Sequence, residues 1–295
     1  MSASTSTAAP KRYVLITGCS PGGIGHALAL EYHRQGLHVI ATARRLEVIE
    51  DLRALGMTTL RLDVTDKEAI RSARDEIDEL TGGRLDVLIN NAGYGYTVAV
   101  TDMHLEDVRN LFETNVIAPV AMVQAFAPML IASGDGRIVQ LGSIAGFAPI
   151  PFGAAYNMSK AALMALSNTL RVEMAPFNVK VVHAIVGRVK TEIVKPRSIP
   201  VDSLFRPMEE VFQAKRIGVS QEGAMPADEL ARELVPETLR SHPKRWVWAG
   251  GQTWIPWFFY TFLGQPGFDW LMRKMFGFSE FSGVCIDGEP KLIPV

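Results

Sequence analysis

Cysteine is scarce in this chain, which has only two cysteines, Cys19 and Cys285, among 295 residues. Two cysteines imply no disulfide framework, and their scarcity is typical of a protein kept in a reducing compartment. The sequence also lacks any spacing of Cys and His that would bind zinc. These absences argue against a disulfide scaffold and a structural zinc module, and they favour a cytoplasmic protein.

An excess of charge of one sign is also lacking, because the formal net charge at pH 7 is −1. A nucleic-acid-binding protein needs clustered Lys and Arg to displace counterions, and no basic stripe is present, so we expect no nucleic-acid partner. Residues 1–10 are small and polar, without an apolar run. This N-terminus is therefore not typical of a secretory signal, and we expect it to be disordered.

No Pro/Gly/Ser-rich linker divides the middle of the chain. Its composition of 48% hydrophobic and 21% charged residues suits a globular protein with a large core. We therefore expect one catalytic domain over 11–245, followed by a C-terminal extension over 246–295.

Segments typical of strands and of helices alternate along this domain. The predicted strands are 13–16, 37–41, 57–62, 85–89, 137–141 and 179–185, and the predicted helices are 24–35, 45–55, 66–80 and 154–174. Residues 105–130 are predicted as two helical stretches or as one long helix that is kinked around Pro119. Such alternation indicates βαβ units with right-handed crossovers. It predicts an α/β fold with a doubly wound parallel sheet (a Rossmann fold), which binds ligands at the carboxyl ends of its strands.

A glycine-rich loop joins the first predicted strand to the first predicted helix. It reads Thr17-Gly18-Cys19-Ser20-Pro21-Gly22-Gly23-Ile24-Gly25. Glycines let the backbone approach a pyrophosphate, and the N-terminus of the helix offers N–H donors and a positive dipole end. The alternative is a simple tight turn. The nucleotide interpretation predicts cofactor contacts from Gly18, Ser20, Gly23, Ile24 and Gly25.

The end of the second predicted strand distinguishes between the two nicotinamide cofactors. An NAD site usually has an acidic residue there that bonds the ribose 2′-hydroxyl, and no acid is present in this stretch. Two arginines, Arg44 and Arg45, follow the strand instead, and an arginine there can pair with a 2′-phosphate. We therefore predict NADP(H) as cofactor; the alternative is that both arginines are solvated surface residues.

Asp63 and Val64 stand at the end of the third predicted strand, on the same edge of the sheet. We expect both to contact the cofactor. The Asp63 carboxylate either accepts a hydrogen bond from the adenine amino group or caps the helix that begins near Asp66.

Tyr156 and Lys160 lie four residues apart on a predicted helix and therefore share one face. An ammonium group near a phenol favours the phenolate and lowers a pKa that is about 10 in isolation. Tyr156 then serves as an acid or base near neutral pH. Ser143 follows the fifth predicted strand and can hydrogen-bond a substrate oxygen, and Asn115 can hold a water that links Lys160 to solvent. Tyr-x-x-x-Lys alone is common by chance, but its combination with Ser143 and the glycine loop is not.

These motifs resemble the short-chain dehydrogenase/reductase family over residues 12 to about 195. The resemblance rests on the glycine-rich loop, Asn90-Asn91-Ala92-Gly93, Ser143 and Tyr156-Asn157-Met158-Ser159-Lys160. It implies a catalytic tetrad and further cofactor contacts. The implied tetrad is Asn115, Ser143, Tyr156 and Lys160, and the implied cofactor contacts are Asn91 on the adenine ribose side, Ala92, Gly93, Tyr156, Lys160, Val189 and Thr191.

The resemblance also implies a mechanism, in which NADPH delivers a hydride to a carbonyl carbon while Tyr156 donates a proton to the oxygen. Two departures leave the cofactor contacts open: the loop is one residue longer than usual, and Val186 stands where the family has proline. Two other functions fit the same fold, a non-redox isomerase or cyclase and a sensor that binds NADP(H) without turnover. Pairing of helices in the family implies a homo-dimer or homo-tetramer.

Aromatic residues gather near the C-terminus, where 246–278 contains all five tryptophans. The densest run, 254–263, is shorter than the about 20 residues that span a bilayer, but its aromatics and the nearby Arg273 and Lys274 suit a membrane interface. The segment is similar in style to the acyl-dihydroxyacetone-phosphate reductase branch of the family, which acts on lipids at membranes. The alternatives are a substrate lid, packing or a dimer contact. We expect a bulky apolar substrate and a flexible, specificity-setting loop over 196–230.

Overall fold

A parallel sheet forms the centre of the protein, in a computed structural model that describes residues 11–191, 193, 196–218, 223–286 and 289–294. The sheet has seven strands in the order β3-β2-β1-β4-β5-β6-β7. The strands are β1 (Tyr13–Ile16), β2 (His38–Ala43), β3 (Thr58–Arg61), β4 (Val87–Asn90), β5 (Arg137–Leu141), β6 (Lys180–Val186) and β7 (Trp246–Ala249). The order reverses between β1 and β4, which is the switch point where doubly wound folds bind ligands.

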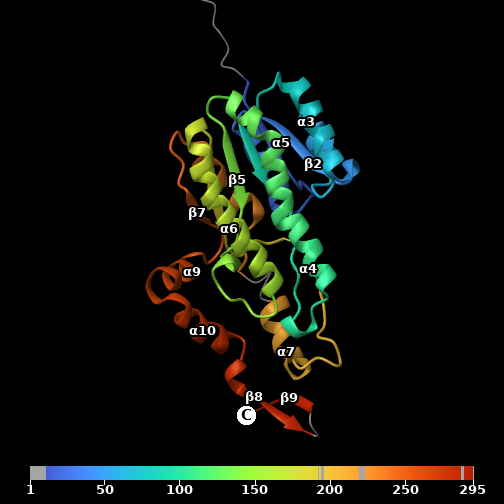
Figure 1. Cartoon of the computed structure of the whole chain (residues 1–295), viewed down its shortest axis with the longest axis vertical. Coiled ribbons are helices and arrows are strands. Elements are labelled where there is room, and N and C mark those ends of the chain that lie inside the picture. The colour runs from blue at the N-terminus through green and yellow to red at the C-terminus, as the bar shows by residue number, and fades with distance from the viewer. Residues whose placement is uncertain (1–10, 192, 194–195, 219–222, 287–288, 295) are drawn as a thin grey trace, which may run out of the picture.

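Helices cover both faces of the sheet (Figure 1). The α-helices of the described residues are α1 (Ile24–Arg34), α2 (Glu50–Ala54), α3 (Lys67–Thr81), α4 (Leu105–Phe112), α5 (Ala118–Ala132), α6 (Ala154–Met174), α7 (Glu209–Phe212), α8 (Ala227–Thr238), α9 (Trp254–Phe258) and α10 (Gly264–Met275), of which α7, α9 and α10 lie beyond the sheet. Along β1, Val14 and Ile16 face a core shared with α1 and α8, whereas Leu15 faces a second core under α3, α5 and α6. Because successive strand side chains point to opposite faces, one short apolar strand supports both layers.

The predicted fold is confirmed, and the strands expected at 13–16 and 137–141 and the helix expected at 154–174 have the predicted bounds. The other predicted strands differ from the observed ones by at most two residues at either end. The segment 45–55 divides into a short 3-10 turn (Leu46–Ile49) and α2. Strong local periodicity explains this agreement, since buried strands and amphipathic helices leave clear sequence patterns.

The seventh strand was not predicted, because its residues lie inside the aromatic-rich segment. Val247 and Ala249 of β7 are buried in the core, and β7 pairs with β6 in parallel. The sheet therefore extends past the boundary expected at 245. The aromatic rings of Trp246 and Trp248 lie on the other side of the strand and pack against Phe147 at centroid distances of 5.5 and 5.4 Å.

Helices α4 and α5 form one continuous helix, Leu105–Ala132, with a π-helical turn, η3 (Glu113–Ile117), between them. Pro119 follows this turn and has no N–H to donate to the carbonyl of Asn115, which gives a physical reason for the extra residue. This helix is long and apolar enough by composition to cross a membrane. Its Met122, Phe126 and Leu130 side chains are instead buried against the sheet, as in a core helix.

The segment predicted as a loop over 196–230 contains helical structure. It includes α7, the π-helical turn η7 (Gln213–Ile217) and the start of α8. Helix α8 packs beside α1, where the hydroxyls of Tyr32 and Thr238 hydrogen-bond at 2.6 Å. The last residues of the predicted loop therefore belong to the outer helical layer of the sheet.

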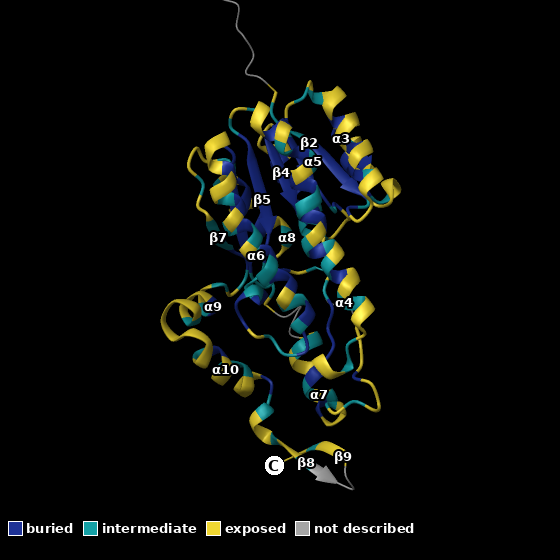
Figure 2. Cartoon of the chain, viewed as in Figure 1, coloured by how far each residue is buried: buried dark blue, intermediate teal, exposed yellow. Residues whose placement is uncertain are grey.

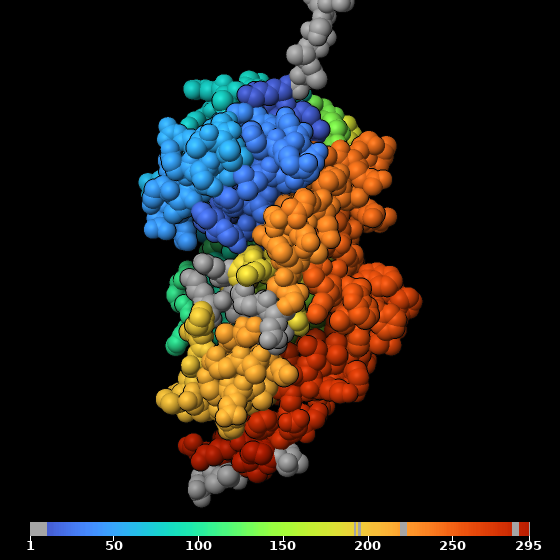
Figure 3. Space-filling view, turned by 180° about the vertical axis from the view of Figure 1, so that it is seen from behind, coloured from blue at the N-terminus to red at the C-terminus, as the bar shows by residue number. Residues whose placement is uncertain are grey.

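The C-terminal extension runs along one side of the molecule and ends in a hairpin of β8 (Phe281–Ile286) and β9 (Glu289–Pro294) (Figure 1). Figure 3 shows these red residues against the gold residues of the segment that contains α7 (196–218, here called the α7 segment). The contact is aromatic, since the ring of Phe152 lies 5.1 Å from Phe212 and 6.0 Å from Phe278. Helices α9 and α10 are largely exposed (Figure 2). Residues 1–10, expected to be disordered, lie outside the described residues.

Candidate active site

The glycine loop lies at the carboxyl end of β1 and leaves no room for side chains at two places. Gly18 has a φ of +73°, and a Cβ there would lie 3.0 Å from the Cα of Ala92. A Cβ on Gly25 would lie 2.4 Å from both the carbonyl oxygen of Gly18 and the Nδ2 of Asn91. Only glycine fits these positions, so the loop folds tightly against the start of α1.

Thr17 and Asn91 fix the loop to the end of β4. The Thr17 hydroxyl accepts hydrogen bonds from the backbone N–H groups of Asn91 and Ala92, both at 3.0 Å. The Asn91 side chain donates to the carbonyl oxygens of Thr17 and Gly18 at 2.8 and 2.9 Å. The Asn91 side chain thus holds the backbone of the glycine loop in place, a role that was not predicted for it. The role of Thr17 was also missed, although it stands in the quoted motif.

A dinucleotide fits this loop by shape and by charge. Ser20 and Gly22 are exposed, and Gly23 is the N-cap of α1, whose first turn contains no acidic residue. The first N–H groups of a helix lack intrahelical acceptors and carry the positive end of the helix dipole. The backbone around Gly23, Ile24 and Gly25 is therefore suited to hold a pyrophosphate.

The two arginines after β2 differ in their surroundings, although both are exposed. Arg44 carries a charge that acts on Asp63, after β3, and on Tyr94, after β4. Arg45 forms an ion pair with Glu47 at 3.8 Å. Arg44 is thus the arginine whose charge acts on groups that follow β3 and β4, at the carboxyl edge where a 2′-phosphate would lie.

Asp63 does not cap α3, because Asp66 does so by accepting from the N–H groups of Glu68 and Ala69 at 2.9 and 3.3 Å. The Asp63 Oδ1 accepts instead from the backbone N–H and the hydroxyl of Thr65. These bonds hold the pKa of Asp63 below its usual value, together with Arg44 and Arg61. Asp63 is therefore an ionised acceptor at the strand edge, and Val64 beside it is buried.

Tyr156, Lys160 and Ser143 meet at the carboxyl end of β5. Ser143 follows β5, and Tyr156 and Lys160 lie in the first two turns of α6. The Lys160 ammonium donates to the carbonyl oxygen of Leu141 at 2.7 Å and lies 5.6 Å from the centre of the Tyr156 ring. The structure thus brings together three residues that the sequence separates by up to 17 positions.

Burial is the largest influence on the pKa values of Tyr156 and Lys160. Burial raises the pKa of Tyr156, while the hydrogen bond from Ser143 and the charge of Arg216 oppose that rise. Burial also lowers the pKa of Lys160 to about 8. The expected depression of the Tyr156 pKa by Lys160 is therefore not seen in the folded chain, in which the net direction is upward. The charge that does act on the phenol comes from Arg216, a residue absent from the predicted site.

Asn115 lies in η3, and its side chain connects three segments. Its Nδ2 donates to the carbonyl oxygen of Tyr94 at 3.0 Å and to the Ser159 hydroxyl at 3.1 Å, and its Oδ1 accepts from the Tyr94 N–H at 3.1 Å. A Cβ on Gly93 would lie 3.0 Å from this Oδ1. The Asn115 amide therefore joins the loop after β4 to α6, close to Lys160.

The segment after β6 borders the same edge. Val189 is buried and pairs with Met225, and Arg188 bonds through its N–H to the carbonyl oxygen of Gly251 at 3.0 Å. Val186, which stands in place of the usual proline, continues the pairing of β6 with β7. Thr191 follows as a half-buried residue at this edge.

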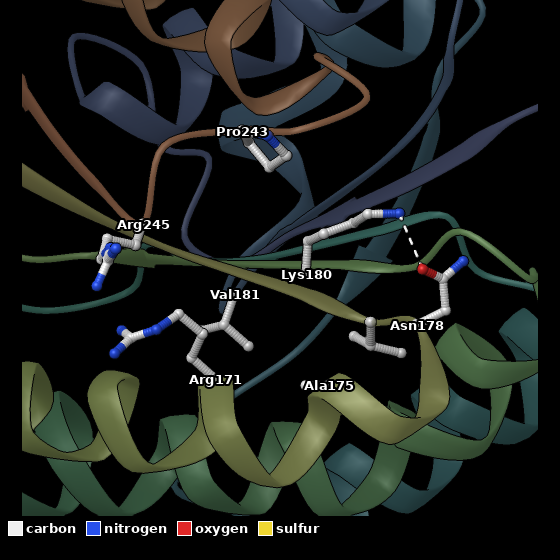
Figure 4. A pocket seen from close by; sticks show the side chains of 8 residues that line it. Arg171, Ala175, Asn178, Lys180, Val181, Pro243 and Arg245 are labelled. Carbon is white, nitrogen blue, oxygen red and sulfur yellow. Dashed lines mark hydrogen bonds between the residues drawn. The ribbon is translucent and has the colours of Figure 1, made fainter.

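A surface pocket elsewhere is separate from this site. The pocket in Figure 4 lies where β6 begins and is bordered by the end of α6 and the segment before β7. Its lining residues are Arg171, Ala175, Asn178, Val179, Lys180, Val181, Pro243 and Arg245. It lies at the amino ends of the strands, opposite the edge that carries Tyr156. Among the described residues, no group of His, Cys, Asp or Glu side chains could hold a metal ion.

Comparisons with known proteins agree with this geometry. Residues 12–200 match the sequence pattern of the short chain dehydrogenase family. The chain is 40% identical over 272 residues to the short-chain dehydrogenase srdE of Neurospora crassa, covering 91% of this chain and 93% of that protein. It is 43% identical over 213 residues to the NADPH-dependent 1-acyldihydroxyacetone phosphate reductase of Schizosaccharomyces pombe, covering 70% and 72%.

A solved structure supports the same assignment. The crystal structure of a short-chain dehydrogenase from Streptomyces avermitilis superposes with a TM-score of 0.75 at 26% identity, covering 92% of this chain and 97% of that one. The family match spans β1 to β6 and includes Ser143, Tyr156 and Lys160. The chain therefore belongs to the short-chain dehydrogenase family.

Proposed function

We propose that this enzyme uses NADP(H) to reduce a ketone on a bulky apolar substrate, or to oxidise the corresponding secondary alcohol. The observation that carries the proposal is the meeting of Tyr156, Ser143 and Lys160 at the sheet edge that also holds the glycine loop. A relative with 43% identity is named as an NADPH-dependent reductase. Arg44 after β2 suits the 2′-phosphate that distinguishes NADP(H) from NAD(H).

Each residue of the site has a separate role in the proposed reaction. The cofactor, when bound, supplies or accepts the hydride. The Tyr156 hydroxyl donates its proton to the substrate oxygen, and the Ser143 hydroxyl hydrogen-bonds the same oxygen. Lys160, which donates to the Leu141 carbonyl, would hydrogen-bond the nicotinamide ribose when the cofactor is bound and would return a proton to the phenol. The raised pKa of Tyr156 keeps the phenol protonated, which suits a proton donor in the direction of reduction.

The substrate body would lie against the aromatic cluster beside the site. Phe152 lies four residues before Tyr156 and packs against Phe205 and Phe212 of the α7 segment at 5.7 and 5.1 Å. These residues belong to a buried apolar cluster that also includes Met208 and Phe276. A substrate with a large apolar part would extend this cluster by burying further apolar surface.

The test follows absorbance at 340 nm with NADPH and a panel of hydrophobic ketones, in the wild type and in Tyr156→Phe. We expect NADPH consumption by the wild type and a fall in kcat of at least about 100-fold in Tyr156→Phe, because general acid catalysis contributes about 10²–10⁴-fold. NADPH affinity should stay within a few-fold. A Tyr156→Phe variant with near-normal turnover would refute the assignment. Tight NADPH binding without consumption by any ketone would favour a non-redox isomerase or cyclase, or a sensor.

We also propose that the exposed part of the extension contacts the surface of an intracellular membrane or lipid body, with the enzyme otherwise cytoplasmic. Trp254, Phe262 and Trp270 are 69%, 63% and 60% exposed. Arg273 and Lys274 follow in the last turn of α10 and offer positive charge to anionic headgroups. Large exposed aromatics beside basic residues favour an interface with lipid over water.

Sedimentation with vesicles that contain anionic phospholipid tests this contact. The triple variant Trp254→Ser/Phe262→Ser/Trp270→Ser should lose at least about tenfold in vesicle affinity, because each serine buries less apolar area in the lipid than the aromatic ring that it replaces. Val201→Ser, which changes an 84% exposed residue outside the extension, is the control. Equal vesicle binding by all three proteins would contradict the membrane contact. So would a wild type that stays in the supernatant with vesicles at low salt. Either result would favour a role of the extension as a lid or in packing.

The family's helix pairing leads us to propose a homo-dimer or homo-tetramer. Ile117 and Ile131 on the long helix and Val172 on α6 are exposed apolar residues that such pairing would cover. Light scattering of the purified protein gives the mass directly, and a monomer at micromolar concentration would contradict this proposal.

A further inference from the structure

Arg216 is a half-buried cation beside the first turn of the helix that carries Tyr156. It lies in η7, and its Nη2 is 3.4 Å from the position that a Cβ would take on Gly153, the N-cap of α6. Its Nε is buried and has no hydrogen-bond partner among the described residues. The guanidinium thus reaches from the α7 segment to the first turn of the helix that carries Tyr156.

Among the described residues, no acidic side chain forms an ion pair with Arg216. Burial lowers the pKa of Arg216, and the only charge that opposes this among the described residues is that of Tyr156. Conversely, Arg216 acts to lower the pKa of Tyr156. A buried charge is normally paired or bonded on several sides, since removing it from water without compensation is unfavourable.

Arg137, a more deeply buried arginine, shows how the chain bonds a guanidinium that has only a structural role. Arg137, 2% exposed, bonds through its Nη groups to the carbonyl oxygens of Asp135 and Arg240 and pairs with the Asp135 carboxylate at 2.8 Å. Arg216 has neither kind of contact among the described residues. Packing alone therefore does not explain why a cation stands at this place.

The first turn of α6 adds further attraction for an anion. This 21-residue helix has no acidic residue in its first turn and no side-chain cap. Asn157 Oδ1 is buried without a hydrogen-bond partner and lies 3.4 Å from the same Cβ position at Gly153. An amide oxygen can orient a guanidinium, but it cannot neutralise one. The guanidinium and the helix N-terminus together favour a negative charge there.

We propose that Arg216 and the N-terminus of α6 bind an anionic group, a carboxylate or a phosphate, on the substrate carbon chain next to the carbonyl that Tyr156 protonates. This inference rests on the proposed function and narrows its substrate. The substrate would be an amphiphile, with an apolar body against Phe152 and Phe212 and an anion close to the reacting carbon. Reduction consumes one NADPH and one proton and converts the ketone to the secondary alcohol, and the anionic group stays unchanged.

The first experiment compares charged and neutral partners of the same ketone. One pair is a medium-chain 3-oxo carboxylic acid and its methyl ester; the other is an alkyl hydroxymethyl ketone with and without a phosphate on its hydroxyl. The wild type should prefer at least one anionic partner, and the pair that shows the preference distinguishes carboxylate from phosphate. Equal kcat/KM within both pairs would overturn the proposal.

Arg216→Met removes the charge and keeps most of the apolar stem, and Arg216→Lys keeps the charge. For the preferred anionic ketone, Arg216→Met should lower kcat/KM by roughly 10- to 100-fold, the range of a hydrogen bond to a charged group. The loss for the neutral partner should be less than about threefold, and Arg216→Lys should recover part of the loss. Arg197→Met is the matched control, since Arg197 is an exposed cation of the same segment that lies over Tyr96.

Other outcomes would contradict the anion site. An equal loss on charged and neutral ketones, with a shifted pH profile of kcat, would mean that Arg216 acts on Tyr156 alone. A weaker affinity for NADPH would mean that the guanidinium contacts the cofactor. Calorimetric binding of the 3-hydroxy acid, which needs no turnover, should weaken in Arg216→Met even if the redox function fails. Melting temperatures of both Arg216 variants near that of the wild type exclude misfolding as the cause.

Discussion

Arg44 and Arg45 form a matched pair for testing how this enzyme would select NADPH. Arg44 acts electrostatically on Asp63 and Tyr94. Asp63 follows β3, which pairs with β2, and Tyr94 follows β4, which pairs with β1 at the switch point. Arg45 has its own partner in Glu47 at 3.8 Å. Replacing each arginine by alanine therefore removes one positive charge from adjacent positions, but only Arg44→Ala should remove the contact to the 2′-phosphate.

The expected magnitude follows from the exposure of Arg44. A hydrogen bond to a charged group contributes about 1.5–3 kcal/mol, whereas exposed ion pairs contribute about 0–1 kcal/mol. Because Arg44 is exposed and the phosphate is doubly charged, we expect about 1.5 kcal/mol, or roughly tenfold in affinity. NADH has no 2′-phosphate, so its affinity should stay unchanged in Arg44→Ala.

The assay measures the dissociation constants of NADPH and NADH by fluorescence, and kcat/KM for both with one ketone. The NADPH effect should shrink with rising ionic strength, because exposed charges are screened. Arg45→Ala should change either constant by less than about twofold. The reasoning is refuted if both variants weaken NADPH equally, or if neither alters the ratio of NADPH to NADH affinity.

Two further predictions concern the supports of the site. Thr17→Val should lower the free energy of unfolding by about 2–4 kcal/mol, because it leaves the N–H groups of Asn91 and Ala92 without their acceptor. Urea titration measures this free energy. Thr17→Ser keeps the hydroxyl, so its free energy of unfolding should stay near that of the wild type. Burial and then Lys160 lower the pKa of His183 to about 3 from an ordinary value of 6.5. As the pH falls below 6.5, His183 binds a proton in the unfolded chain but stays neutral in the folded chain. The free energy of unfolding therefore falls by about 2 kcal/mol between pH 6.5 and pH 5. His183→Asn should remove that part of the pH dependence in urea titrations, and an unchanged slope would argue against a neutral buried imidazole.

The fold could be predicted from sequence because its elements are short and strongly patterned. The strand 137–141 and the helix 154–174 have the bounds that their local periodicity predicts. Strand β7 escaped prediction because Trp246 and Trp248 made its segment resemble the aromatic extension. Its strand character comes from pairing with β6 and from burial of Val247 and Ala249, which are tertiary features.

The candidate site divides in the same way. Ser143, Tyr156 and Lys160 were predicted from motif spacing, and the structure brings them to one edge. Asn91 is predicted to line the cofactor, and the structure adds that its side chain bonds the glycine loop. Residue type and spacing could not reveal this, because the partners are backbone carbonyls 73 and 74 positions away.

The sequence by itself determined the parallel sheet, the glycine loop and the reacting groups, because each depends on residues close together in the chain. Only the tertiary structure decided which charges surround Tyr156. Arg216 lies 60 positions from Tyr156 in a segment without a motif, and it acts on the phenol because η7 folds over the first turn of α6. Burial depends on such long-range packing, and it is burial that raises the pKa of Tyr156 and lowers that of Lys160.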